Sequence, residues 1–109
     1  MAQYLLAVYH APGQHSTAPE GAVARVAVFN QTLIDANQLV YAAGLQDPAT
    51  AITSSATGAL GDGPLHPSAP QVGGFWVIEA ATRTEAESIA VRASAACGQD
   101  VELRPMQTE

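Results

Sequence analysis

The most apolar stretch of the chain is Gly73-Gly74-Phe75-Trp76-Val77-Ile78-Glu79-Ala80, and it constrains the fold more than any other segment. Aromatic and aliphatic side chains follow one another there without alternation, which is typical of a strand with apolar side chains on both faces. We therefore predict a central strand over residues 74–80. The two glycines in front of it permit an unusual backbone or a close approach by another segment.

Further strands are predicted on both sides of this stretch. Residues 3–10 and 39–45 are apolar runs of strand length. Residues 100–106 alternate apolar and charged side chains, as a half-buried last strand does. A small hairpin is predicted from the Thr-rich residues 50–54 and the short return 59–60, because a turn with a glycine lies between them.

Two helices are predicted between the strands. The first covers residues 19–36, since Pro19-Glu20 suits a first helical turn and Asn37 suits the left-handed position after the last. The second covers residues 85–96 and follows Thr84-Glu85-Ala86-Glu87, which has the spacing of a capping box. The side chains expected to face the sheet recur at intervals of three and four: Val23, Val26, Ala27, Phe29, Asn30, Leu33 and Ile34 in the first helix, and Ala86, Ile89, Ala90, Ala93 and Cys97 in the second.

Without the small hairpin, the order of elements is βαββαβ, which predicts an α+β protein of ferredoxin-like type. Two helices then pack on one face of a four-stranded antiparallel sheet, and residues 1–109 form a single domain. Three strands are apolar on both faces, and the helices cover only one. We therefore expect a homodimer with the two sheets face to face, a dimeric α+β barrel with space for a small apolar ligand between the sheets.

The amino-acid composition of the chain limits which kinds of binding partner we expect. The formal net charge is −6, there is no lysine, and the four arginines are scattered, so we do not expect a nucleic-acid partner. The single cysteine excludes an internal disulfide framework, and the apolar N-terminal run is too short to cross a membrane, so we expect a cytoplasmic protein. The chain lacks a phosphate loop, a dinucleotide fingerprint and a nucleophile elbow, and we predict no cofactor.

Five pieces of the sequence form an ordered pattern: Tyr4-Leu5-Leu6-Ala7-Val8-Tyr9, Gly44-Leu45-Gln46-Asp47-Pro48, Asp62-Gly63-Pro64-Leu65, Gly73-Gly74-Phe75-Trp76-Val77-Ile78-Glu79 and Val101-Glu102-Leu103-Arg104-Pro105. In this pattern the chain resembles the YCII-related proteins, and more closely their DGPF (DGPFAETKE) subgroup. The resemblance extends over nearly the whole chain. It implies a dimeric ferredoxin-like α+β barrel and no settled reaction.

The chain departs from that family at positions that bear on catalysis. Leu65 replaces the phenylalanine of the DGPF turn, and an uncharged segment, His66-Pro67-Ser68-Ala69-Pro70, replaces the charged AETKE part. The broader group is suspected of using a His on the first helix with an Asp near its end. Asp35 lies at the place of that Asp, but Val26 lies at the place of the His. The incomplete pair favours a binding or accessory module over an enzyme.

Three residues are candidates for acid–base chemistry. His10 ends the first strand near the expected barrel mouth, where a histidine acts as acid or base near neutral pH, although a satisfied or exposed histidine is the alternative. Asp35 lies unfavourably at the negative end of a helix dipole and is either functional or simply solvated. Asp62 is either a turn residue that accepts a hydrogen bond from its own backbone or a pocket carboxylate.

Two classes of function remain open. The first is a binding or accessory dimer. The alternative is a small-molecule lyase, isomerase or dehalogenase in which His10 works with Asp35 or Asp62. Tyr9, Tyr41, Phe75 and Trp76 are expected in the core or interface first and as pocket lining second. A metal site made of His10, His15 and His66 has no supporting spacing, and we predict none.

Overall fold

The computed structural model describes residues 1–15 and 18–107. Each predicted element is present, with shifted bounds. Along the chain they are β1 (Ala2–His10), α1 (Ala22–Asp35), β2 (Leu39–Gly44), the short 3₁₀ helix η1 (Pro48–Thr50), β3 (Ile52–Ser54), β4 (Leu60–Asp62), β5 (Gln71–Ala80), α2 (Arg83–Cys97) and β6 (Asp100–Pro105).

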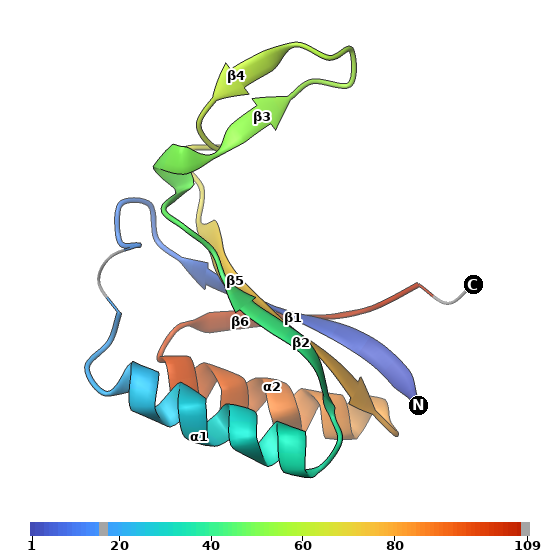
Figure 1. The fold of residues 1–109 in the computed structure, drawn as a ribbon. Coiled ribbons are helices and arrows are strands. Elements are labelled where there is room, and N and C mark those ends of the chain that lie inside the picture. Colours follow the sequence, from blue (N-terminus) through green and yellow to red (C-terminus); the bar gives the residue numbers. More distant parts are fainter. Residues whose placement is uncertain (16–17, 108–109) are drawn as a thin grey trace.

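Four strands form one antiparallel sheet in the order β2-β5-β1-β6, and β3 pairs with β4 in a separate two-stranded sheet. Both helices lie on the same face of the large sheet (Figure 1). The α+β class with a four-stranded antiparallel sheet is therefore confirmed, and β5 is one of its two central strands. Neither helix in the described part of the chain has the length and apolar character that a membrane-spanning helix requires.

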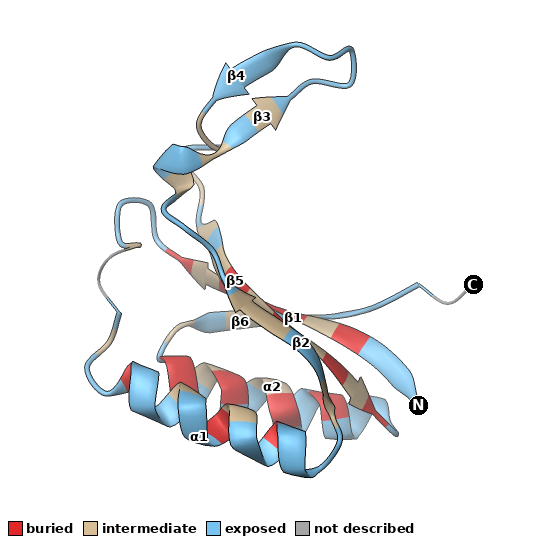
Figure 2. Ribbon diagram, viewed as in Figure 1, coloured by how far each residue is buried: buried red, intermediate tan, exposed pale blue. Residues whose placement is uncertain are grey.

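The core fills the layer between the helices and the sheet, where the buried residues of Figure 2 face one another. Its fully buried large side chains are Leu6, Leu33, Ile78 and Ile89. The rings of Trp76 and Phe29 meet edge to face, with 5.3 Å between their centroids. The stripe on α1 is narrower than predicted, because Val23 and Ile34 are 81% and 51% exposed.

The start of α1 differs from the prediction. Pro19 and Glu20 do not form a first helical turn, because the N-cap is Gly21 in a left-handed conformation, with φ 77°. Arg25 holds this turn: its side chain donates to the carbonyl of Glu20 at 2.9 Å and to that of Ala96, at the end of α2, at 3.0 Å. The helix end is as predicted, since Asn37 follows it with φ 57°.

The predicted capping box of α2 is wrong by two residues. The N-cap is Thr82, whose hydroxyl accepts a hydrogen bond from the Glu85 amide at 3.1 Å. The Glu85 carboxylate reaches back to the amide of Ala81, also at 3.1 Å. The spacing Thr-x-x-Glu occurs twice in overlapping positions, and the earlier copy caps the helix because β5 ends only two residues before it.

The β3–β4 hairpin projects from the end of the molecule opposite the helices (Figure 1). This projection helps to raise the radius of gyration to 15.1 Å, against about 13 Å for a compact chain of this length. Of the two roles considered for Asp62, that of a turn residue is not seen, because its carboxylate accepts no hydrogen bond within residues 1–15 and 18–107. Instead the Gly63 amide donates to Ala51 at 2.7 Å, and Asp47 accepts from the Ala49 amide at 2.8 Å.

Candidate functional site: a cleft between α1 and the sheet

Two adjoining hollows open between α1 and the sheet. One, of about 360 Å³, is lined by Val8, Asn30 and Trp76 among others. The other, of about 320 Å³, is lined by His10, His15 and Gln99 among others. Val26, Gly73 and Cys97 line both. We call the two hollows together the α1 cleft; its size is at the lower end of the range for small-molecule sites.

Small residues on two neighbouring strands create the cleft. Gly74 pairs with Gly44, and a side chain at Gly74 would place its Cβ 3.0 Å from the carbonyl oxygen of Ala43. Gly73 is the extra residue of a bulge, because Val8 pairs with Gly74 and Tyr9 pairs with Val72. Without large side chains at these positions, the sheet does not fill the space beneath α1.

His10, which lines the cleft, has an unpartnered ring nitrogen. Its side chain is 7% exposed, and its Nδ1 lies 3.0 Å from the carbonyl oxygen of Ala11. A carbonyl only accepts, so Nδ1 must be the donor, and in the neutral ring Nε2 then carries the lone pair. Nε2 is buried and has no hydrogen-bond partner among the described residues. Such an atom costs free energy unless a ligand satisfies it.

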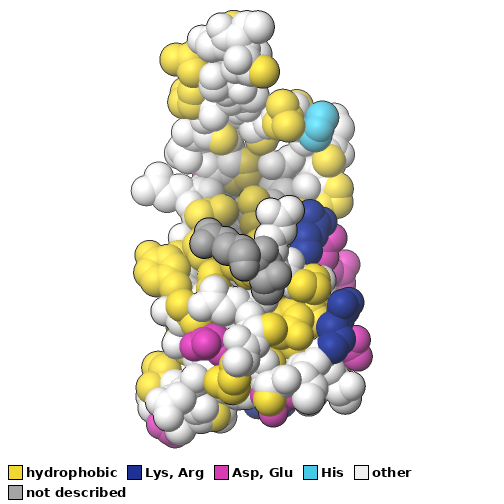
Figure 3. Space-filling view, turned by 90° about the vertical axis from the view of Figure 1, so that its right-hand side faces the viewer, with side chains coloured by type: hydrophobic (Ala, Val, Ile, Leu, Met, Phe, Trp, Pro, Cys, Tyr) yellow, Lys and Arg dark blue, Asp and Glu magenta, His cyan; other side chains and the backbone are white. Residues whose placement is uncertain are grey.

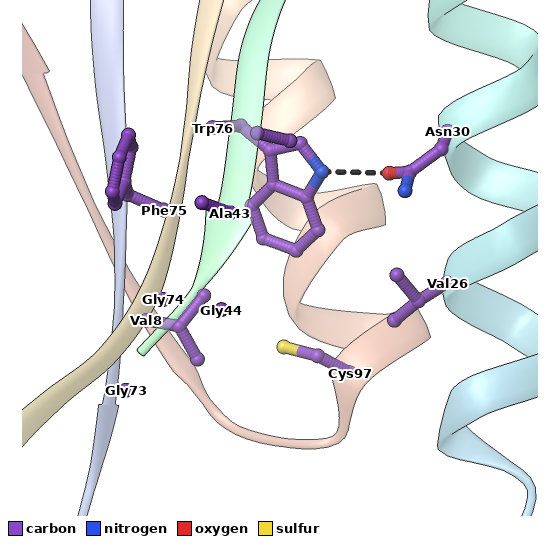
Figure 4. Close-up of a pocket in the computed structure, with 11 residues that line it drawn as sticks. Val8, Val26, Asn30, Ala43, Gly44, Gly73, Gly74, Phe75, Trp76 and Cys97 are labelled. Atoms are coloured by element: carbon purple, nitrogen blue, oxygen red, sulfur yellow. Dashed lines mark hydrogen bonds between the residues drawn. The ribbon is translucent and has the colours of Figure 1, made fainter. Parts of the chain in front are cut away.

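At the other end of the cleft, Asn30 offers hydrogen-bond donors, whereas His10 offers an acceptor. The indole N–H of Trp76 donates to Asn30 Oδ1 at 2.7 Å (Figure 4). Because the indole N–H is only a donor, this bond fixes the orientation of the amide. The two N–H groups at Nδ2 then remain able to donate hydrogen bonds. In residues 1–15 and 18–107, no protein acceptor takes them.

The lining between these two groups is apolar and uncharged. Val8, Val26 and Cys97 point into the space beside Trp76 (Figure 4). The Cys97 side chain is 8% exposed, as expected for a small buried hydrophobe. Neither hollow is lined by Asp, Glu, Lys or Arg among the described residues. An ion would lose its hydration there without gaining a counter-charge, so the cleft suits an uncharged ligand.

The structure does not bring the predicted acid–base residues together. Asp35 is the last residue of α1, is exposed, and accepts a hydrogen bond from Gln31 at 2.8 Å. Asp62 lies exposed on the projecting hairpin. Neither lines the α1 cleft, and within the described ranges neither is bonded to His10.

Of the four predicted pocket aromatics, Trp76 faces the cleft. The Phe75 ring lies on the opposite side of the strands, although Phe75 contributes to the lining (Figure 4). Tyr41 packs beside it, with 6.0 Å between the ring centroids, and is 60% exposed. Tyr9 is half-buried on the face without helices, next in sequence to His10. A pocket between two sheets needs a second copy of the chain and stays a prediction.

His10, His15 and His66 do not come together in the structure. The rings of His10 and His15 meet edge to face at 5.5 Å, while His66 is exposed in the loop before β5. Within the described segments, no group of three or more His, Cys, Asp or Glu side chains is placed to hold a metal ion.

Comparison with known proteins does not assign the chain to a family, because no family model and no curated protein matches it. The YCII/DGPF resemblance therefore stays a prediction. Sequence reasoning missed Asn30 and Val26 as cleft residues, having placed both only on the helix face that meets the sheet. A usable signal was the run of small residues Ala42-Ala43-Gly44, whose Gly44 pairs with Gly74 on the next strand, because small residues leave room beneath a helix.

Proposed function

We propose that this protein binds a small, uncharged, largely apolar molecule in the α1 cleft. The observation that carries this proposal is the buried Nε2 of His10, which has no protein partner in the described residues and belongs to a side chain that lines a ligand-sized hollow. A ligand that donates a hydrogen bond there removes an energetic cost of the empty protein. The uncharged lining on both sides of His10 supports the same class of ligand.

Binding is better supported than acid–base catalysis by the predicted residues. The alternative reading needs Asp35 or Asp62 beside His10, and both carboxylates are exposed on elements that do not line the cleft. The Nδ1 contact of His10 is a backbone carbonyl instead. We therefore propose that His10 accepts a hydrogen bond from the ligand.

We further propose a homodimeric, ferredoxin-like member of the YCII/DGPF group. The strand order and the helices on one face support the ferredoxin-like part. The helix-free face supports the dimer: strands β1, β2 and β5 present side chains there that stay half-buried or exposed, namely Leu5, Tyr9, Tyr41, Phe75 and Val77. Figure 3 shows hydrophobic side chains on the hairpin and below it, with charged ones along one edge and over the lower part of the molecule.

Ligand binding is tested with the single tryptophan as a reporter, because Trp76 lines the cleft. A panel of uncharged fragments of one or two rings is titrated while Trp76 fluorescence and thermal unfolding are followed. We expect saturable changes that are abolished in Val26→Phe, which fills the middle of the cleft. Val28→Phe is the matched control, since Val28 is 67% exposed on the same helix. A response that persists unchanged in Val26→Phe, or its absence from the wild-type protein, contradicts the proposal.

A further inference from the structure

We propose that the ligand is an elongated molecule with a hydrogen-bond donor at one end and an acceptor at the other. This inference rests on the proposed binding function and names the class of ligand. The donor end is a hydroxyl or N–H group that meets Nε2 of His10, and the acceptor end is a carbonyl-type oxygen that meets Nδ2 of Asn30. The body between them is apolar and uncharged.

The polarity of each end follows from a fixed protein contact. His10 is tied through Nδ1 to a carbonyl, so its neutral ring offers an acceptor at Nε2. Asn30 is tied through Oδ1 to the Trp76 indole, so its amide offers a donor at Nδ2. The two ends are therefore not interchangeable, and a ligand with two acceptors or two donors satisfies only one of them.

The length of the ligand follows from the register of the sheet. Trp76, which is hydrogen-bonded to Asn30, pairs with Leu6 of β1. His10 lies four residues further along the same strand. Four residues of strand span about 13 Å, so we take the two polar atoms to lie on the order of 12–13 Å apart. Hydrogen bonds of about 2.9 Å at each end leave several ångströms for the ligand. A para-substituted six-membered ring has this span.

At the donor end, the His10 ring is in contact with the His15 ring and lies close to Gly73. Nε2 of His10 is shielded from solvent, and the His15 ring rests edge-on against the His10 ring. A ligand that reaches Nε2 must therefore displace the atoms that shield it. Gly73 lies close to the imidazole on another side: a Cβ there would be 2.8 Å from Cδ2 of His10. Strand backbone closes that side.

Four probes of nearly equal shape test the inference on the full chain. 4-Hydroxyacetophenone carries both polar ends, 4-methylacetophenone only the acceptor, 4-ethylphenol only the donor, and 4-ethyltoluene neither. Dissociation constants are measured by the fluorescence of Trp76. We expect the first probe to bind tightest, with the loss of either polar end weakening binding about 3- to 10-fold.

Two variants assign each effect to its residue. In His10→Phe, the advantage of the hydroxyl disappears while that of the carbonyl persists. In Asn30→Asp, which keeps an acceptor for the Trp76 indole, the advantage of the carbonyl disappears while that of the hydroxyl persists. Equal binding of all four probes to the wild-type protein overturns the inference but leaves the binding function standing. If no probe binds, the inference also falls, and the fragment panel with Val26→Phe decides the binding function separately.

Discussion

Gly73 occupies the bulge of β5 beside the His10 ring, and the absence of a side chain there lets the ring fit the cleft wall. A Cβ at this position would lie 2.8 Å from Cδ2 of His10, which is closer than the two atoms can pack. The ring would have to move, and its Nδ1 bond to Ala11 would be lost.

Gly73→Ala is therefore expected to destabilise the protein by about 1–3 kcal/mol, the usual cost of overpacking a buried site. Gly61→Ala is the control, because no atom lies within 4 Å of the Cβ it adds. Urea denaturation gives the free energy of unfolding of both variants. If Gly73→Ala is as stable as Gly61→Ala, the proposed packing of His10 is wrong.

Individual residues also show which parts of the candidate site could be predicted from the sequence alone. His10 was identified as a candidate from its residue type and its place at a strand end, and it does line the cleft. Its partner was not predictable, because the Nδ1 contact is to a backbone carbonyl, which every residue carries. Asn30 lay in the expected helix stripe, but its hydrogen bond to Trp76 joins residues 46 positions apart and leaves no local pattern.

At the scale of elements, long-range contacts fix the place where α1 begins. The Arg25 bond to Ala96 and the close approach of Pro19 to Gly98, where a Cβ would lie 2.9 Å from the Pro19 ring, tie the turn before α1 to the end of α2. Local pattern predicted the helices, the strand order along the chain and the left-handed Asn37 correctly. It placed the start of α1 wrongly, because propensity does not report such contacts, and the start of α2 wrongly, because two overlapping copies of the capping spacing compete.

The corrected cap of α2 gives a direct prediction. Thr82→Ala removes the hydroxyl that accepts the Glu85 amide, and we expect a loss of about 1 kcal/mol in the free energy of unfolding. Thr84→Ala removes the hydroxyl of the cap predicted from sequence, and it should change stability by less than about 0.5 kcal/mol. Denaturant titrations of both variants distinguish the two positions. A larger loss of stability in Thr84→Ala than in Thr82→Ala would show that Thr84 is the N-cap of α2.

At the scale of the whole molecule, two apolar surfaces remain without a partner in the single chain. One is the helix-free face of the sheet. The other is the projecting hairpin, on which Ile52 and Leu60 are exposed. An isolated two-stranded hairpin is only marginally stable in water. A second copy placed against the helix-free face would remove much of this apolar surface from water, which is the basis of the proposed dimer.

Sedimentation measures this association. We expect the wild-type protein to be a dimer at micromolar concentration, and Tyr41→Glu to shift it toward monomer, because the charge is placed on the helix-free face where Tyr41 is already exposed. Val91→Glu, on the outer side of α2, is expected to remain dimeric. A monomeric wild-type protein, or a Tyr41→Glu variant that dimerises as tightly, contradicts the proposed interface.

The central claim is that Nε2 of His10 is an acceptor reserved for a ligand, and ¹⁵N NMR of the histidine side chains tests it most directly. The account predicts that the neutral His10 ring carries its proton on Nδ1. It also predicts that the Nε2 resonance moves in the direction of hydrogen-bond acceptance as 4-hydroxyacetophenone is added, and stays in place with 4-methylacetophenone. A proton found on Nε2, or an Nε2 resonance that responds to neither probe, would contradict the account.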